Sequence, residues 1–313
     1  MRICVLDDYE HAAHGAADWV SLAADRLIIM DRHVTGPPLV ELLQSVDVIV
    51  VQRERTPLTR DLLVQLPNLR LVVTTGERNA AIDLEACRER QVTVSATTNM
   101  GSPVDELAWA LILAGARDLV GRASGMLAGR WEPRPGRALE GRVLGLLGLG
   151  RTGTRMARIA TAFDMPVITW SANLSQHTAE EAGARLVSKH ELFAEADVVS
   201  IHLLLSPRTH HLVGAAELSL MKAGAWLVNT SRGPIVDEAA LIAACRNGVI
   251  AGAALDVFEE EPLGSEHPLR RLPNVILTPH VGYLTHECLE HWYADAVDSI
   301  AAWAAGAPIR LLT

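Results

Sequence analysis

Three charged side chains in the last third of the chain each follow a short apolar run. They are Arg232, Glu261 and His280. A guanidinium can hold a carboxylate through two parallel hydrogen bonds, and a histidine can pass a proton to or from an oxygen near neutral pH. A glutamate beside that histidine would orient its ring. Taken singly, each residue is more simply a surface ion pair or a buried, hydrogen-bonded histidine. Gathered in one place, they suit proton transfer on a substrate that carries a carboxylate.

A glycine-rich turn stands earlier in the chain. The apolar run 143–147 leads into Gly-x-Gly-x-x-Gly, formed by Gly148, Gly150 and Gly153, and a helical segment follows. The first glycine permits a tight turn, the second lets the backbone approach a pyrophosphate, and the third lets helix and strand pack closely. The N–H groups at the start of the helix would hold the phosphates. We therefore predict a dinucleotide-binding turn that also includes Arg151 and Thr152.

The position expected to determine the preference for NAD or NADP holds a serine, Ser171, and not an acidic residue. A carboxylate for the adenosine ribose is expected at the end of the next strand, about twenty residues on. Ser171 stands there, and no acid follows until Glu180. The segment also lacks an arginine or lysine that could meet a 2′-phosphate. The sequence therefore predicts NAD or NADP as cofactor, with Ser171 near the ribose, and does not choose between them.

Short apolar strands alternate with helical stretches along nearly the whole chain, which is typical of an α/β protein with parallel sheets. The pattern falls into two series, so we predict two doubly wound units separated near residues 99–103. Ligands of open parallel sheets bind outside the carboxyl ends of the strands, where Arg232, Glu261 and His280 would converge. The predicted strands cover residues 3–6, 27–30, 46–51, 69–74 and 92–94 in the first series, and 143–147, 167–170, 198–202, 226–229, 251–256 and 275–278 in the second.

Composition narrows the class of protein further. The 313 residues suffice for two domains. A net charge of -9 disfavours a nucleic-acid partner, which would require a basic surface. The apolar run at the N-terminus is shorter than a secretory signal needs, and the longest apolar helix candidate, 107–116, is half the length of a membrane span. The four cysteines have no metal or redox spacing. We expect a cytoplasmic protein with reduced thiols, no membrane association and no metal site.

Four motifs occur in an order that indicates a known family. They are Gly-Leu-Gly-Arg-Thr-Gly, Asn-Thr-Ser-Arg-Gly-Pro-Ile-Val-Asp-Glu, Ala-Leu-Asp-Val-Phe-Glu-Glu-Glu-Pro-Leu and Thr-Pro-His-Val-Gly. With these motifs the chain resembles the D-isomer-specific 2-hydroxyacid dehydrogenases, which include phosphoglycerate dehydrogenase, D-lactate dehydrogenase and hydroxypyruvate/glyoxylate reductase. The resemblance covers essentially the whole chain.

The resemblance implies a role for each charged residue. Arg232 would clamp the substrate carboxylate and carbonyl, His280 would be the general acid/base, and Glu261 would be its partner. Asp256 would meet the nicotinamide carboxamide, and Thr230 would line the cofactor groove. The implied reaction moves a hydride between NAD(P)(H) and C2 of a small D-2-hydroxy acid or 2-keto acid.

The resemblance also implies the domain arrangement and a partner. A flavodoxin-like substrate/catalytic domain, residues 1–99 and 284–313, would enclose a Rossmann-type NAD(P)-binding domain, residues 100–283. The last helical segment would thereby return to the first domain. Residues 117–139 resemble the arm through which family members form homodimers, although an ordinary long surface loop remains the alternative.

The substrate loop differs from the family pattern. Its counterpart here includes Thr75, Gly76 and Glu77, where members usually carry a glycine-rich loop followed by Val-Asp-Asn. Thr75 and Gly76 are expected to contact substrate, with Glu77 nearby. Arg53 matches a first-domain arginine that reaches substrate or cofactor, or is a solvated charge at a strand end. Tyr283 either walls the pocket or packs at an interface.

Two other functions compete with dehydrogenation. Transcriptional corepressors use the same fold to sense NAD(H), so a catalytically weak sensor is the alternative reading. Formate oxidation also occurs on this scaffold, but that branch pairs its histidine with glutamine, whereas this chain has Glu261. Retention of all three catalytic residue types gives no reason to prefer sensing.

Overall fold

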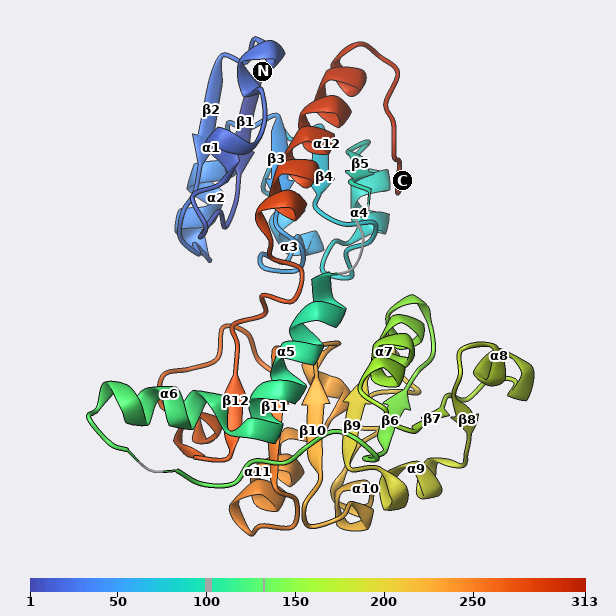
Figure 1. Ribbon diagram of the computed structural model, residues 1–313. Helices are drawn as coiled ribbons and strands as arrows, with labels where there is room; N and C mark the ends of the chain where they lie inside the picture. The colour runs from blue at the N-terminus through green and yellow to red at the C-terminus, as the bar shows by residue number, and fades with distance from the viewer. Residues whose placement is uncertain (99–102, 132) are drawn as a thin grey trace. The chain divides into compact units, whose positions relative to one another are not determined.

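A computed structural model describes residues 1–98, 103–131 and 133–313 (Figure 1). Contacts divide the chain into two compact units. Unit 1 comprises Met1–Gly101 and Leu284–Thr313, and unit 2 comprises Ser102–Tyr283. The expected boundary between residues 99 and 100 lies outside the described residues.

Unit 1 is built on a five-stranded parallel sheet with the order β2-β1-β3-β4-β5. This is the flavodoxin-like order, in which the chain reverses direction across the sheet beside the first strand. The two strands Val48–Val51 and Leu71–Thr74 are fully buried and consist of β-branched and leucine residues, as expected for a sheet covered on both faces. The strands are β1 (Arg2–Val5), β2 (Arg26–Ile29), β3 (Val48–Val51), β4 (Leu71–Thr74) and β5 (Thr93–Ala96).

Alternate residues of these strands enter two separate cores, one on each face of the sheet. Ile49 and Val72 face the helices α2 (Pro37–Leu43), α3 (Arg60–Leu63) and α4 (Leu84–Glu89). Val48 and Leu71 face the other side, which is covered by α1 (Ala13–Ala16), the 3-10 turn η1 (Trp19–Leu22) and the last helix, α12 (His286–Ala304). Beyond α12, the C-terminal residues run antiparallel to β5, where Leu312 donates its N–H to the Val94 carbonyl at 2.8 Å.

Unit 2 contains a seven-stranded parallel sheet with the order β12-β11-β10-β9-β6-β7-β8. Read from β8 to β11, this is the Rossmann order, with the reversal beside β6. The strands are β6 (Leu144–Leu147), β7 (Val167–Trp170), β8 (Arg185–Leu186), β9 (Val198–Ile201), β10 (Trp226–Asn229), β11 (Gly252–Leu255) and β12 (Val275–Leu277).

Helices cover both faces of this sheet as well. Leu144 and Val228 belong to the core shared with α5 (Pro103–Arg117), α7 (Arg151–Ala162) and α8 (Gln176–Glu181). Val199 and Leu227 belong to the opposite core, formed with α9 (Lys189–Glu195), α10 (Ala215–Leu220) and α11 (Glu238–Arg246). The remaining elements are α6 (Leu119–Leu127) and the 3-10 turns η2 (Gly233–Ile235) and η3 (Pro268–Arg271).

The predicted α/β class with two doubly wound sheets is confirmed. Every predicted strand is present within two residues at each end, and β8 is an addition that the sequence did not indicate. Part of the arm, predicted as either a dimer contact or a loop, is the helix α6; Glu132 within it lies outside the description. Among the described residues no helix could cross a membrane.

Candidate active site

The charged residues singled out from the sequence follow neighbouring strands at one edge of the unit 2 sheet. Arg232 follows β10, Glu261 lies in the segment after β11, and His280 follows β12. These three strands are parallel and paired side by side. Their carboxyl ends therefore meet, and the structure places the three residues at the same edge of the sheet.

His280 and Glu261 are in direct contact. Nδ1 of His280 lies 2.6 Å from Oε2 of Glu261, and the other carboxylate oxygen accepts the backbone N–H of Phe258 at 2.9 Å. A carboxylate at Nδ1 requires the hydrogen on that nitrogen, so Nε2 is the atom left for chemistry. The two side chains are 23% and 33% exposed, which leaves the ring accessible. The ring of Tyr283 lies edge-on to His280 with centroids 5.6 Å apart.

Asp256 holds the segment that carries His280. Its carboxylate accepts hydrogen bonds from the Thr278 hydroxyl at 2.6 Å and from the N–H groups of Val281 and Gly282 at 2.9 and 2.8 Å. Burial raises the pKa of Asp256, and these three hydrogen bonds oppose the shift. The backbone of His280 has a φ of 55°, a left-handed conformation that few non-glycine residues adopt. Asp256 therefore fixes an unusual turn that presents the imidazole.

Arg232 is held close to the Glu261 segment by its neighbour. A side chain on Gly233 would lie only 1.9 Å from the backbone of Phe258, so the two segments touch through their main chains. Asn229 donates to the Arg232 carbonyl at 3.0 Å, and the guanidinium donates to the Ser231 carbonyl at 2.8 Å. The turn after β10 is thus held by hydrogen bonds and packed against the turn after β11.

The glycine turn has the geometry that a dinucleotide requires. Gly148 has a φ of 98°, and a Cβ there would meet the His202 carbonyl at 2.6 Å. A Cβ on Gly153 would meet the Gly148 carbonyl at 2.3 Å, whereas Gly150 faces open space. No side chain caps the start of α7, so its first N–H groups remain available to phosphates. The hydroxyl of Thr230 is buried without a hydrogen-bond partner. These residues fit a bound NAD(P).

Two further residues lie at the same edge as the glycine turn. Ser171 directly follows β7 and is half-buried. His202 follows β9, and its Nε2 lies 2.9 Å from the Ser200 hydroxyl. Burial lowers the pKa of His202 to about 4, so the ring is neutral at physiological pH.

The predicted substrate residues of unit 1 also come together. The N–H of Arg53 donates to the Thr75 hydroxyl at 2.9 Å, and a Cβ on Gly76 would collide with the Arg53 guanidinium at 1.9 Å. Arg53 has a φ of 50°, and its Nε lies 3.6 Å from the Glu54 carboxylate. Glu77, in contrast, is exposed to solvent.

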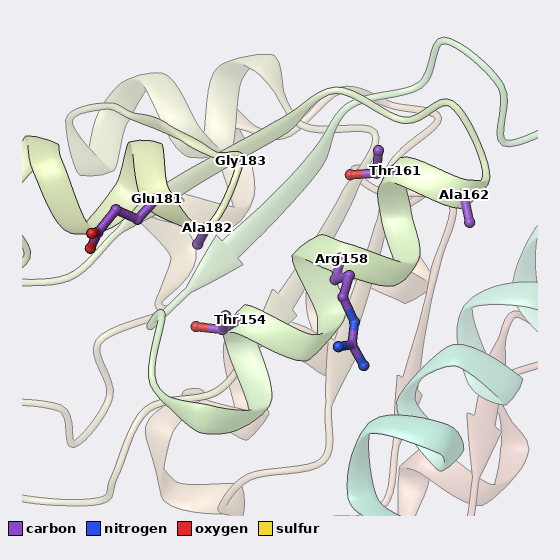
Figure 2. A pocket seen from close by; sticks show the side chains of 7 residues that line it. All are labelled: Thr154, Arg158, Thr161, Ala162, Glu181, Ala182 and Gly183. Atoms are coloured by element: carbon purple, nitrogen blue, oxygen red, sulfur yellow. The ribbon is translucent and has the colours of Figure 1, made fainter.

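A shallow groove of about 510 Å³ lies elsewhere in unit 2, between α7 and the turn that links α8 to β8 (Figure 2). Thr154, Arg158, Thr161 and Ala162 of α7 line it on one side, and Glu181, Ala182 and Gly183 line it on the other. It contains none of the catalytic candidates, so we assign it no role in the reaction. No cluster of metal ligands is present among the described residues.

Comparison with known proteins defines the family. Residues 109–282 match the family model of the D-isomer specific 2-hydroxyacid dehydrogenase, NAD binding domain. Glyoxylate reductase of Aeropyrum pernix is 42% identical over 256 residues, which cover 79% of this chain and 76% of the relative. Glyoxylate/hydroxypyruvate reductase B of Yersinia enterocolitica is 36% identical, over 86% and 84%. The crystal structure of phosphoglycerate oxidoreductase from Vibrio cholerae superposes with a TM-score of 0.92 at 36% identity, over 98% and 100%.

The chain belongs to the D-isomer specific 2-hydroxyacid dehydrogenase family. It is an oxidoreductase that transfers a hydride between NAD(P)(H) and a 2-hydroxy or 2-keto acid. The comparisons give no support to the NAD(H)-sensing alternative.

Sequence reasoning missed two residues beside this site, Glu238 and His267. The glutamate ends the second family motif, yet nothing in that motif indicates that its carboxylate meets a histidine 29 positions away. The structure joins them at 3.0 Å.

Proposed function

We propose that this dehydrogenase reduces a small 2-keto acid of the size of glyoxylate or hydroxypyruvate, with Arg232, Glu261 and His280 as its catalytic residues. The observation that carries the proposal is the 2.6 Å contact between Nδ1 of His280 and Glu261 at the carboxyl edge of the sheet. The names of the two reductase relatives support the substrate class.

The hydride for the keto carbon comes from the reduced nicotinamide when the cofactor is bound. Arg232 would bind the substrate carboxylate and offset the charge that develops on the carbonyl oxygen. His280, protonated on both nitrogens, would donate its Nε2 proton to that oxygen as the carbonyl carbon accepts the hydride. Glu261 would keep the ring oriented and stabilise the imidazolium through Nδ1.

The test is steady-state reduction of glyoxylate, hydroxypyruvate and pyruvate by the parent and by His280→Gln, each with NADH and with NADPH. Loss of a general acid should lower kcat at least about 100-fold. His177→Gln is a matched control, because His177 also pairs with a glutamate, at 3.3 Å, but lies on the exposed face of α8. A His280→Gln enzyme with parental kcat would refute the assignment, and a parent inactive on all three acids would refute the substrate class.

The remaining site residues are part of the same proposal. The dinucleotide would be held by the turn after β6 and by side chains at the ends of β7, β10 and β11. These residues are Gly148, Gly150, Arg151, Thr152, Gly153, Ser171, Thr230 and Asp256. Arg53, Thr75 and Gly76 are proposed to contact substrate, supported by their mutual packing at the carboxyl ends of β3 and β4.

We also propose that the protein is a homodimer joined through the arm at residues 117–139. Several large apolar side chains of this arm are exposed. Monomeric soluble proteins rarely expose large contiguous apolar patches, so these side chains support an interface with a second subunit. They are Leu119, Val120, Met126, Leu127 and Trp131. A cytoplasmic location is supported by the four buried free cysteines.

A further inference from the structure

The segment that carries Glu261 is fastened to the turn after β10 and to the start of α11, away from the reactive pair. The carbonyl of Phe258 rests against Gly233. One residue further on, the N–H of Glu259 donates to Oε2 of Glu238, at the first position of α11, over 3.3 Å. Glu261 itself accepts the Phe258 N–H. The backbone at 258–259 therefore sets the position of the Glu261 carboxylate.

Glu238 is in turn held by His267. Nε2 of His267 lies 3.0 Å from Oε1 of Glu238, and the two side chains are 25% and 16% exposed. Nδ1 of His267 accepts the Leu269 N–H at 3.4 Å, so the hydrogen of the neutral ring is on Nε2 and points to Glu238. The Glu238 carboxylate thus accepts from a ring on one oxygen and from the Glu259 backbone on the other.

We propose that Glu238, held by His267, is a positioning residue for catalysis that keeps Glu261 aligned with His280. The inference rests on the proposed function, since it assigns Glu238 a role only through the Glu261–His280 pair. A misplacement of a catalytic group by about 1 Å can lower the rate about 100-fold. Among the described residues, Glu238 makes no hydrogen bond or ion pair with the three proposed catalytic side chains, and its partners are the Glu259 N–H and His267.

At position 238, only a carboxylate can accept hydrogen bonds from both of the groups that face it. Both groups facing Glu238 are donors, and glutamine offers only one oxygen. In Glu238→Gln the amide nitrogen would point a hydrogen either at the His267 ring or at the Glu259 N–H. One of the two contacts should fail, although the side chain keeps its shape.

Glu217 provides a matched control. It occupies the first turn of α10, pairs with Lys189 at 2.7 Å and is 17% exposed, so its charge and burial resemble those of Glu238. Its carboxylate accepts the Gly214 N–H, and in the part of the chain that the structure describes no hydrogen bond or ion pair joins it to the Glu261 segment. Glu217→Gln therefore reports what the loss of a half-buried helix-start carboxylate does to the fold alone.

The experiment compares kcat, KM and NADH affinity in the parent, Glu238→Gln, Glu217→Gln, Glu261→Gln and the double variant Glu238→Gln/Glu261→Gln. We expect Glu238→Gln to lower kcat about 10-fold, with the substrate KM and the NADH Kd within about twofold of the parent. Glu217→Gln should keep parental kcat. In the Glu261→Gln background the second substitution should change kcat less than twofold, because Glu238 would have no carboxylate left to position.

Several results would overturn the inference. Parental kcat in Glu238→Gln would do so, as would additive losses in the double variant, since additivity indicates a general structural effect. Parental kcat in Glu261→Gln would instead refute the catalytic role proposed for Glu261, and a parent inactive on all three keto acids would refute the proposed function, so these failures are distinguishable from failure of the inference. If Glu238→Gln does not fold, His267→Gln tests the same chain of contacts and should lower kcat in the same direction, with parental kcat again contradicting the inference.

Discussion

Ser171 directly follows β7, where the side chain that contacts the adenosine ribose of a bound dinucleotide is expected. A carboxylate there would accept from the ribose hydroxyls and repel a 2′-phosphate, and the serine does neither strongly. We expect the parent to use both NADH and NADPH, with a difference below about 3 kcal/mol, the scale of one charged hydrogen bond. Ser171→Asp should shift the ratio of kcat/KM toward NADH. A parent that prefers one cofactor by clearly more than about 3 kcal/mol, roughly 160-fold in kcat/KM, would show that other residues control selection.

His202 predicts a pH effect on stability. Its pKa in the folded protein is lowered to about 4 by burial, below the unfolded value of about 6.5. The folded state therefore binds fewer protons between these values, and stability is lost as the pH falls from about 6.5 toward 4. Between pH 7.5 and pH 5 the loss attributable to His202 should reach about 2 kcal/mol.

Urea unfolding of the parent and His202→Gln at both pH values measures this contribution. The difference in unfolding free energy between parent and variant should decrease on acidification, because only the parent has the histidine to protonate. A difference that stays constant with pH would mean that the ring titrates normally in the folded protein.

At the scale of elements, two glycines of the β6–α7 turn are expected to have different roles. Gly153 allows close packing of the turn, and Gly150 leaves space for the cofactor. Gly153→Ala would place a methyl group 2.3 Å from the Gly148 carbonyl and should destabilise the fold by about 1–3 kcal/mol. Gly150→Ala has open space around it and ordinary backbone angles, with φ of -78° and ψ of -162°. It should leave stability within about 1 kcal/mol of the parent while weakening NADH binding at least tenfold.

Thermal unfolding and NADH fluorescence titration of both variants test this distinction. Unchanged NADH affinity in Gly150→Ala would show that the pyrophosphate does not approach this turn.

The strands were largely predictable because parallel strands buried on both faces read as apolar runs. β8 escaped prediction because it has only two residues, and one of them, Arg185, is exposed. The extent of α6 was also not predicted, since this segment contains two glycines and buries only one residue, so it shows no clear pattern of apolar residues at helical spacing. The local sequence thus indicated the strands that consist of buried apolar residues, and it did not indicate β8 or the extent of α6.

The ends of the strands indicated where Arg232, Glu261 and His280 would gather. The contact between Glu238 and His267 was not predictable, because it depends on where η3 folds back against the start of α11. The triple role of Asp256 as acceptor likewise follows from the left-handed turn at His280, which no residue type signals. Contacts between loops that are distant in sequence become visible only in the three-dimensional structure.

For the whole molecule, the proposed dimer makes a specific prediction. Leu127 is 91% exposed at the end of α6, and Leu127→Glu should shift the sedimentation coefficient from dimer to monomer, because burying an unpaired charge opposes association. Val20, 89% exposed in η1, lies outside the arm, so Val20→Glu should remain dimeric. Equal behaviour of the two variants, or a monomeric parent, would contradict the arm as the interface.

The position of α12 in the chain has a consequence for protein synthesis. One face of the first sheet is completed by Leu289, Tyr293 and Ile300 of this helix, which a ribosome makes some 200 residues after β5. Until then Val48 and Leu71 have no complete cover on that side. Translation of unit 1 therefore begins before that of unit 2 and ends after it. Unit 2 is continuous in sequence, so it can fold before the last part of unit 1 has been synthesised. A nascent chain stalled before α12 is expected to present an apolar sheet face to chaperones.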